Sequence, residues 1–364
     1  MRRIIRKDEK GNKGIVFSAF LATASFVCHI LQWNVIVSFC FALSIAWIVI
    51  EFAWDVATTK RASSFVIALC ILMLFSVVAS GLKLDFDFYK PAIIVLCCIL
   101  CLNNTSKSRL NKTDFRLIQL LFLASAGFVN YMFYYGGLSK IYYGSTQLVA
   151  LNFSNPNECG LWLAVIFIAL LLCMLVEQNK LLKVCNLFAS GSLIPLLNST
   201  GSRNSLLACL LMLFAIIFFT IYRIQKIPKW IVAIFTILPI ATFFLYMYVF
   251  LPNIDFFSEW FEFLIEDGKS LTSRVTIWQT INNDLDACFL LGKYGVYSGN
   301  MHNSLMTLYC MFGTAFVVFI CALFYKVVNC LNIWAQVSLL AIWFTGCFEA
   351  SVFVGVAGLY LMLE

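Results

Sequence analysis

The stretch GKYGVYSGNMHNSLMTLYCMFG, residues 292–313, passes from polar, glycine-rich sequence into a long apolar run. A change of this kind is typical of the border between water and a membrane. The same stretch holds His302, one of only two histidines in the chain. A titratable ring at such a border is either an interfacial residue without a task or part of a functional site. The rest of the sequence has to decide between the two.

The composition indicates that the whole chain belongs to a membrane. Hydrophobic residues make up 62% of its 364 residues, where about 45–50% is usual in soluble proteins. Charged residues make up 12%, against about 25% in soluble proteins, and the mean hydropathy is +0.92. These values predict an all-α polytopic membrane protein with a single membrane domain over residues 1–364.

About 12 transmembrane helices are expected, because a span needs about 20 mostly apolar residues. The candidate spans lie near residues 14–32, 34–53, 63–82, 89–103, 116–136, 158–177, 181–198, 204–222, 229–250, 304–325, 332–349 and 351–363. The last two are alternatively one bent helix. The basic start of the chain resembles a signal peptide, but the apolar run after it exceeds the roughly 7–15 residues of a signal sequence. We therefore interpret this run as the first span.

The distribution of Lys and Arg sets the orientation, because cytoplasmic loops carry the excess of these residues. With twelve spans and a cytoplasmic N-terminus, the cytoplasmic segments hold 18 of the 25 basic residues and the opposite side holds seven. We therefore expect both termini in the cytoplasm.

One large outer, periplasmic loop is predicted at residues 251–303, between spans 9 and 10. Its apolar residues recur at helical spacing in two places, near residues 257–264 and again through Ile277, Ile281 and Leu285. This spacing predicts amphipathic helices. Thr272 or Ser273 is the expected N-cap of the second helix.

The 15 cysteines mostly lie inside apolar runs, where a thiol behaves as a small apolar group. They do not have the spacing of a disulfide framework or of a zinc site. No metal site is expected.

Three ionisable residues stand out at the predicted outer boundary: Arg203, Arg274 and His302. Arg203 lies in the short turn LLNSTGSRNSLL, where small residues allow backbone N–H groups to approach an anion and a guanidinium matches phosphate oxygens. Each residue also has a plainer interpretation. Arg203 is then a snorkelling or loop residue, Arg274 a solvated helix residue and His302 an interfacial residue.

The flanks of these three residues resemble the O-antigen ligase/polymerase superfamily of bacterial cell envelopes. Its members have an S/T-x-SR turn before a span, an R-x-x-x-W helix in a large outer loop, a glycine pair, and an H-N followed by a glycine in the next span. The matching residues here are Ser199 to Arg203, Arg274 with Trp278, Gly292 with Gly295, His302 with Asn303, and Gly313. The segment NFSNPNECG, residues 152–160, resembles the N-P-N element of the family. The resemblance covers roughly residues 150–325, and the glycine pair is G-x-x-G here instead of G-x-G.

The resemblance implies a metal-independent membrane glycosyltransferase that uses an undecaprenyl-pyrophosphate-linked glycan as donor. It implies no sugar nucleotide and no cofactor. Arg203 and Arg274 are expected to bind the diphosphate and stabilise the charge that develops on it. His302 is expected either to remove the proton of the acceptor hydroxyl or to hydrogen-bond the phosphate.

Weaker candidates surround these three. Asn303, Glu158, Trp278 and Tyr142 are candidates for substrate binding. Glu158 alternatively caps the sixth span, and the aromatic rings alternatively belong to the belts of membrane proteins. Glu349 is an acid at the end of an apolar run, and His29 is expected to be a packed histidine.

Within this resemblance, the modest chain length and the Phe-rich spans favour polymerisation of lipid-linked oligosaccharide repeat units into O-antigen or capsular polysaccharide. The alternative within the same chemistry is the ligase that transfers lipid-linked glycan to lipid A-core. A polysaccharide flippase and a scaffolding membrane protein are alternatives of other classes. The expected partners are the lipid-linked donor and acceptor and the membrane lipids, with no nucleic acid. A protein that regulates chain length is left open.

Overall fold

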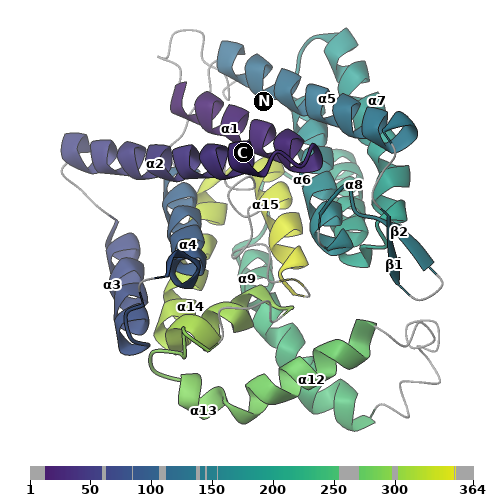
Figure 1. Cartoon of the computed structure of the whole chain (residues 1–364). Coiled ribbons are helices and arrows are strands. Elements are labelled where there is room, and N and C mark those ends of the chain that lie inside the picture. Colours follow the sequence, from purple (N-terminus) through teal and green to yellow (C-terminus); the bar gives the residue numbers. More distant parts are fainter. Residues whose placement is uncertain are drawn as a thin grey trace.

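The computed structural model describes residues 13–59, 63–83, 85–105, 112–136, 140–143, 146–153, 155–253, 270–296, 302–347 and 349. This part of the chain is mostly helical (Figure 1). The elements are α1 (Lys13–Ile30), α2 (Asn34–Thr59), α3 (Ser64–Ala79), α4 (Phe86–Thr105), α5 (Lys112–Tyr135), β1 (Lys140–Tyr143), β2 (Thr146–Val149), α6 (Pro156–Val176), α7 (Lys180–Ser199), α8 (Arg203–Ile221), α9 (Lys229–Leu245), η1 (Tyr246–Phe250), η2 (Leu251–Asn253), α12 (Ser270–Asn283), α13 (Leu285–Cys288), α14 (Ser304–Cys330) and α15 (Ile333–Thr345). The two strands form an antiparallel hairpin.

The helices agree with eleven of the twelve predicted spans, and the last, residues 351–363, lies outside the described residues. In the described part, seven helices are long and apolar enough to cross a membrane, and four apolar helices are shorter. Many large apolar side chains are exposed on α2, α3, α8 and α9, as expected of surfaces that face lipid. The chain therefore has the features of an α-helical membrane protein, while the number of twelve spans is not confirmed.

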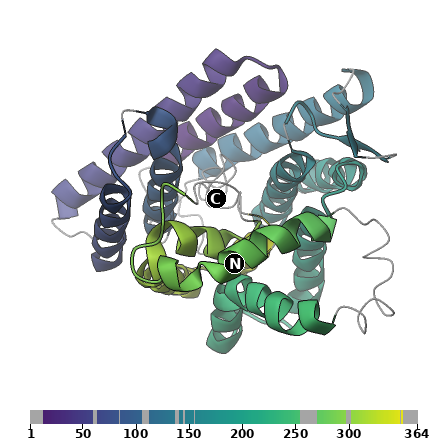
Figure 2. The same cartoon turned by 60° about the horizontal axis from the view of Figure 1, so that its bottom comes forward.

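The predicted outer loop is described in part. Its first predicted helix, near residues 257–264, lies outside the described residues. The second is α12, which begins at Ser270, so the predicted cap at Thr272 or Ser273 is wrong because both residues lie within the helix. Helices α12 and α13 lie across the ends of α9 and α14, and Figure 2 shows them from that side.

Helix α6 lies at the centre of the bundle. All its residues from 159 to 171 are buried, and its sequence is apolar on every side, which is the pattern of an interior helix. It packs against α5, α7, α8 and α15. Helix α14 is the second largely buried helix, and it packs against α3, α4 and α9.

The connections that the sequence places on the outer side meet at one end of the bundle, which we call the His302 end. They are joined by hydrogen bonds or close contacts of Asn152 with Ile30, Leu148 with Gly201, Tyr294 with Phe88, Asn204 with Thr345, and Asn303 with Cys347. At the opposite end the Ile227 N–H donates to Gln336 Oε1 (3.1 Å). The side of a membrane that the His302 end faces stays a prediction.

Helix α14 is broken at Gly313, which has φ 83° and ψ 178°. The break frees backbone groups that a membrane protein has to pair internally. The outer loop supplies partners: the Thr314 N–H donates to the Phe289 carbonyl (2.9 Å), and the Lys293 N–H donates to the Cys310 carbonyl (2.6 Å). Backbone hydrogen bonds thus join the outer loop to the broken helix.

Two glycines permit this close approach. A Cβ atom on Gly313 would meet the Leu290 carbonyl oxygen, and a Cβ atom on Gly292 would meet the backbone of Met311. Both glycines also have positive φ, which glycine adopts without a steric penalty. Gly295 differs, because its φ is not in this region and its nearest neighbour is the Phe88 ring at 3.4 Å.

Tyr294, which lies between Gly292 and Gly295 in the sequence, joins the outer loop to a second helix, α4. Its buried hydroxyl accepts a hydrogen bond from the Ala92 N–H (3.2 Å) and donates one to the Phe88 carbonyl. These two groups would otherwise pair with each other in α4, so the tyrosine is inserted into the helix ladder. Burial raises the pKa of Tyr294 above its ordinary value.

We expect Gly313→Ala and Gly292→Ala to lower the free energy of unfolding by more than about 1–2 kcal/mol. A left-handed conformation alone costs an alanine about this much, and the contacts with the opposite backbone add to it. The matched control, Gly295→Ala, is expected to change stability little. Thermal midpoints of the three detergent-purified variants test this; equal losses for all three would contradict it.

Candidate functional site

His302 lies directly before α14 in a left-handed backbone conformation (φ 51°). Residues other than glycine rarely adopt this conformation, although histidine does so more often than most. A strained conformation persists only where the surroundings hold it, and such residues gather at functional sites. The side chain of His302 is 22% exposed, so the ring lies at the surface of the His302 end without being fully solvated.

Asn303 is the residue that holds this conformation. Its buried side chain donates to the carbonyls of Pro239 in α9 (2.6 Å) and Cys347 after α15 (3.1 Å). Its Oδ1 accepts from the Met306 N–H (3.0 Å), which makes it the N-cap of α14. One amide therefore joins three segments, and its donors and acceptor are used within the protein.

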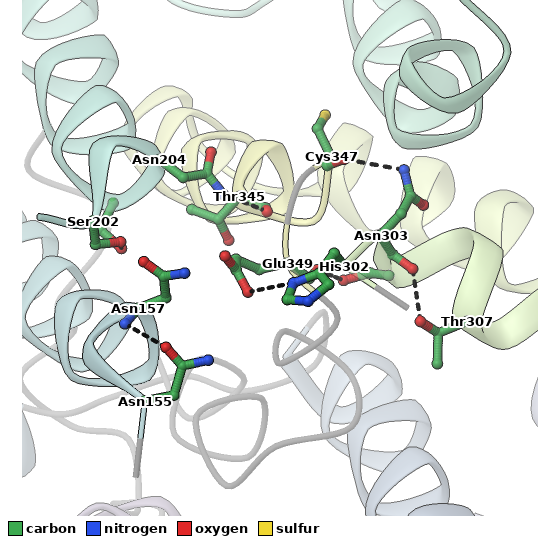
Figure 3. A network of polar contacts seen from close by, with 12 residues as sticks. Asn155, Asn157, Ser202, Asn204, His302, Asn303, Thr307, Thr345, Cys347 and Glu349 are labelled. Carbon is green, nitrogen blue, oxygen red and sulfur yellow. Dashed lines mark hydrogen bonds and ion pairs between the residues drawn. The ribbon is translucent and has the colours of Figure 1, made fainter. Parts of the chain in front are cut away.

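Glu349 is the acidic partner of His302. Its Oε2 lies 3.8 Å from His302 Nδ1, an ion-pair distance when the imidazole is protonated, and its side chain is 4% exposed (Figure 3). The chain around it is fixed, because Ser304 Oγ donates to the Glu349 carbonyl (2.6 Å) and the Glu349 N–H donates to Thr345 (3.1 Å). A carboxylate beside Nδ1 orients an imidazole so that Nε2 faces outward as the basic nitrogen.

Amides and a hydroxyl from two other helix starts lie on the Glu349 side of the pair in Figure 3. Asn155 and Asn157 lie at the start of α6, where the Asn157 N–H donates to Asn155 Oδ1 (2.9 Å). Ser202 and Asn204 lie at the start of α8. Asn204 Nδ2 donates to the Thr345 carbonyl (2.7 Å), while its Oδ1 is buried without a hydrogen-bond donor among the described residues.

A glycine brings these two helix starts together. A Cβ atom on Gly160 of α6 would collide with Ser202 and would lie 2.9 Å from Thr200 Oγ1. Helices α6, α8 and α14 therefore begin in one place, and helix N-termini carry partial positive charge. Their combined field favours an anion near these starts.

Two further charges belong to the same place. Glu158, in the first turn of α6, is repelled by the charge of Glu349 and attracted by that of Lys90 in α4. Lys90 lies in the turn of α4 to which Tyr294 is bonded. The site thus combines two carboxyls, an imidazole and an ammonium group with several amides.

The predicted site residues lie in different parts of the structure. His302, Asn303 and Glu158 lie in the network just described. Arg203 is the exposed first residue of α8, between two network residues. The backbone of Arg274 belongs to α12 and that of Tyr142 to β1, and the side chains of both lie outside the described part.

Trp278 is buried within the outer loop. Its ring packs against the rings of Phe243 (5.5 Å) and Tyr246 (5.0 Å), and its side chain is 1% exposed. This packing fixes α12 on the end of α9. A role in sugar stacking stays a prediction, and we leave Trp278 out of the binding site proposed below. The second histidine, His29, packs against Phe153 (4.2 Å between ring centres), in the manner expected of a packed histidine.

The sequence reasoning missed Lys90 and the amides Asn157 and Asn204 as members of the site. Asn157 belongs to the N-P-N segment and Asn204 directly follows the S/T-x-SR turn, so the signal was present in the neighbours of the residues chosen. Lys90 carried a weaker signal, as one of the few basic residues on the predicted outer side. No family model, curated protein or solved structure matches the chain.

We expect Asn303→Ala to lower the free energy of unfolding by at least about 2 kcal/mol, because it removes the donor to two buried carbonyls as well as a helix cap. Asn179→Ala is the matched control. Asn179 caps α7 and accepts only from the Leu181 N–H, at an exposed position, so about 1 kcal/mol is expected. Unfolding titrations of the two purified variants measure the difference. A smaller loss for Asn303→Ala than for Asn179→Ala would contradict this role of Asn303.

Proposed function

We propose that this chain is a metal-independent membrane glycosyltransferase that polymerises undecaprenyl-pyrophosphate-linked oligosaccharide repeat units at the outer face of a bacterial inner membrane. The product is an O-antigen or a capsular polysaccharide. The proposal starts from the resemblance of residues 150–325 to the O-antigen ligase/polymerase superfamily.

One observation carries the proposal. The N-P-N segment, the S-x-SR turn and the H-N pair are separated by about a hundred residues in some cases, yet they meet around His302 and Glu349 (Figure 3). Gly292 of the glycine pair and Gly313 serve the same site, because they allow the outer loop to pair with the helix that begins beside His302. The N-P-N, S/T-x-SR and H-N motifs thus contribute to one constellation, together with Gly292 and Gly313, whereas Trp278 lies outside it.

The constellation suits attack by a sugar hydroxyl on an anomeric carbon. In this role Nε2 of His302 accepts the proton of the acceptor hydroxyl, whose oxygen forms the new bond to the anomeric carbon. The bond between that carbon and the pyrophosphate breaks, and its electron pair leaves with the pyrophosphate. Glu349 acts as a positioning residue, because its carboxylate orients the imidazole and stabilises the imidazolium that forms.

Charge separates the two substrates within the site. The carboxyls of Glu158 and Glu349 repel a diphosphate but accept hydrogen bonds from sugar hydroxyls, so we assign the acceptor sugar to their neighbourhood. We assign the diphosphate of the donor to the exposed rim near Arg203, where the start of α8 adds its partial positive charge. Arg274 approaches the same diphosphate from the outer loop in this proposal.

The test is a strain that lacks the gene and carries the wild type or a variant at matched protein level, with its surface glycan separated on a gel. His302→Ala is expected to reduce polymer by at least about 100-fold, the lower range for loss of a general base. Arg203→Ala and Arg274→Ala are expected to reduce it strongly. Full polymer from all three variants would contradict the proposed site.

Lys293→Ala is the matched control. Lys293 is a cation of the same predicted face, but it pairs with Asp284 (3.1 Å), and the two side chains are 35% and 36% exposed. It is expected to leave the polymer unchanged, because exposed ion pairs contribute little to stability.

The phenotype of the deletion separates the alternatives. Lipid A-core with single repeat units is expected of a missing polymerase. Bare core with long lipid-linked polymer would identify the ligase instead. Repeat units retained on the cytoplasmic face would identify a flippase.

A further inference from the structure

Two cysteines are buried against each other where the outer loop meets the broken helix. Cys288 is the last residue of α13, and Cys310 lies in the second turn of α14. Neither has exposed surface, and both belong to one small cluster with Phe243, Trp278 and Ile281. Their thiols lie close enough for each to influence the ionisation of the other.

The backbone fixes this pair from both sides. Tyr309, next to Cys310, donates its hydroxyl to the Leu285 carbonyl (2.6 Å). Beyond Cys288, the Phe289 carbonyl accepts from the Thr314 N–H (2.9 Å), and the Lys293 N–H donates to the carbonyl of Cys310 itself (2.6 Å). The two thiols therefore meet because neighbouring backbone groups are paired, and not through a contact of the side chains alone.

The pair differs in this from the three neighbouring cysteines of α4. Cys97, Cys98 and Cys101 lie on one helix, α4, so a bond between them would constrain little. Cys288 and Cys310 lie on different elements, and the chain between them contains His302. A disulfide between them would close a covalent loop that contains His302.

We propose that Cys288 and Cys310 form a disulfide bond in the mature protein. The inference rests on the outer-face orientation of the proposed function, because that compartment is oxidising in bacteria. The bond adds a covalent link to the backbone pairing that holds the loop on α14.

The reaction is a thiol–disulfide exchange with a protein disulfide oxidoreductase of the cell envelope. The thiolate of Cys288 attacks the disulfide of the oxidant and forms a mixed disulfide. The Cys310 thiolate then attacks the sulfur of Cys288 and expels the oxidant as a dithiol. Two protons leave the cysteines, and two electrons pass to the oxidant. The side chain of Cys310 lowers the pKa of Cys288, which favours Cys288 as the first nucleophile.

The test uses the full chain in membranes of intact cells. Free thiols are blocked under denaturing conditions, disulfides are then reduced, and the released thiols are labelled with a maleimide that carries a polymer. The wild type is expected to shift on a gel by the mass of two labels. Cys288→Ser and Cys310→Ser are each expected to lose this shift, and Cys209→Ser, a buried cysteine of α8, is expected to keep it.

A second measurement does not depend on the folding of the variants. Mass spectrometry of digested wild-type protein is expected to find a peptide containing Cys288 joined to one containing Cys310, and to lose the joined species on reduction. An alkaline phosphatase fused after residue 296 reports the side of the loop, because the enzyme is active only outside the cytoplasm.

Each outcome has one consequence. A wild type without label, together with an active fusion, overturns the disulfide and leaves the proposed function standing. A wild type without label, together with an inactive fusion, overturns both the disulfide and the outer-face orientation. Joined peptides that do not involve these two cysteines also overturn the inference.

Discussion

The side chain of Asn303 is the interaction on which the His302 end depends. Helix starts and ends in an apolar protein carry backbone groups that water cannot pair. One amide pairs with three backbone groups, by capping α14 and by donating to a carbonyl within α9 and to one of the chain after α15. Because it fixes the residues on either side of the site, His302 and Glu349 face each other at a defined distance.

The outer loop depends on the same constraint. Helix α14 is interrupted at Gly313, and the loop pairs with the freed backbone on one side while Tyr294 enters the ladder of α4 on the other. The loop is thus an integral part of the helix packing. The proposed disulfide between Cys288 and Cys310 would make this attachment covalent. It would lie where backbone hydrogen bonds already hold the outer loop on α14.

The sequence predicted the helices well because about twenty apolar residues in a row leave little alternative. It also selected His302, since a rare ring at a border is visible without a structure. It could not predict the pairing with Glu349, which follows His302 by 47 positions in number and meets it only through packing. Gly292 and Gly313 were recognised only as parts of a resemblance, because the need for a small residue arises from backbone approach between distant segments. Lys90 and Asn204 were missed because their places in the site follow from the packing of distant segments.

The most direct test of the account is synthesis by the purified chain in lipid nanodiscs, supplied with lipid-linked repeat units from its own strain and with a metal chelator. The account predicts a ladder of products longer than one unit from the wild type and none from His302→Ala. A ladder of equal length from His302→Ala, or a wild type that elongates only when metal is restored, would contradict it.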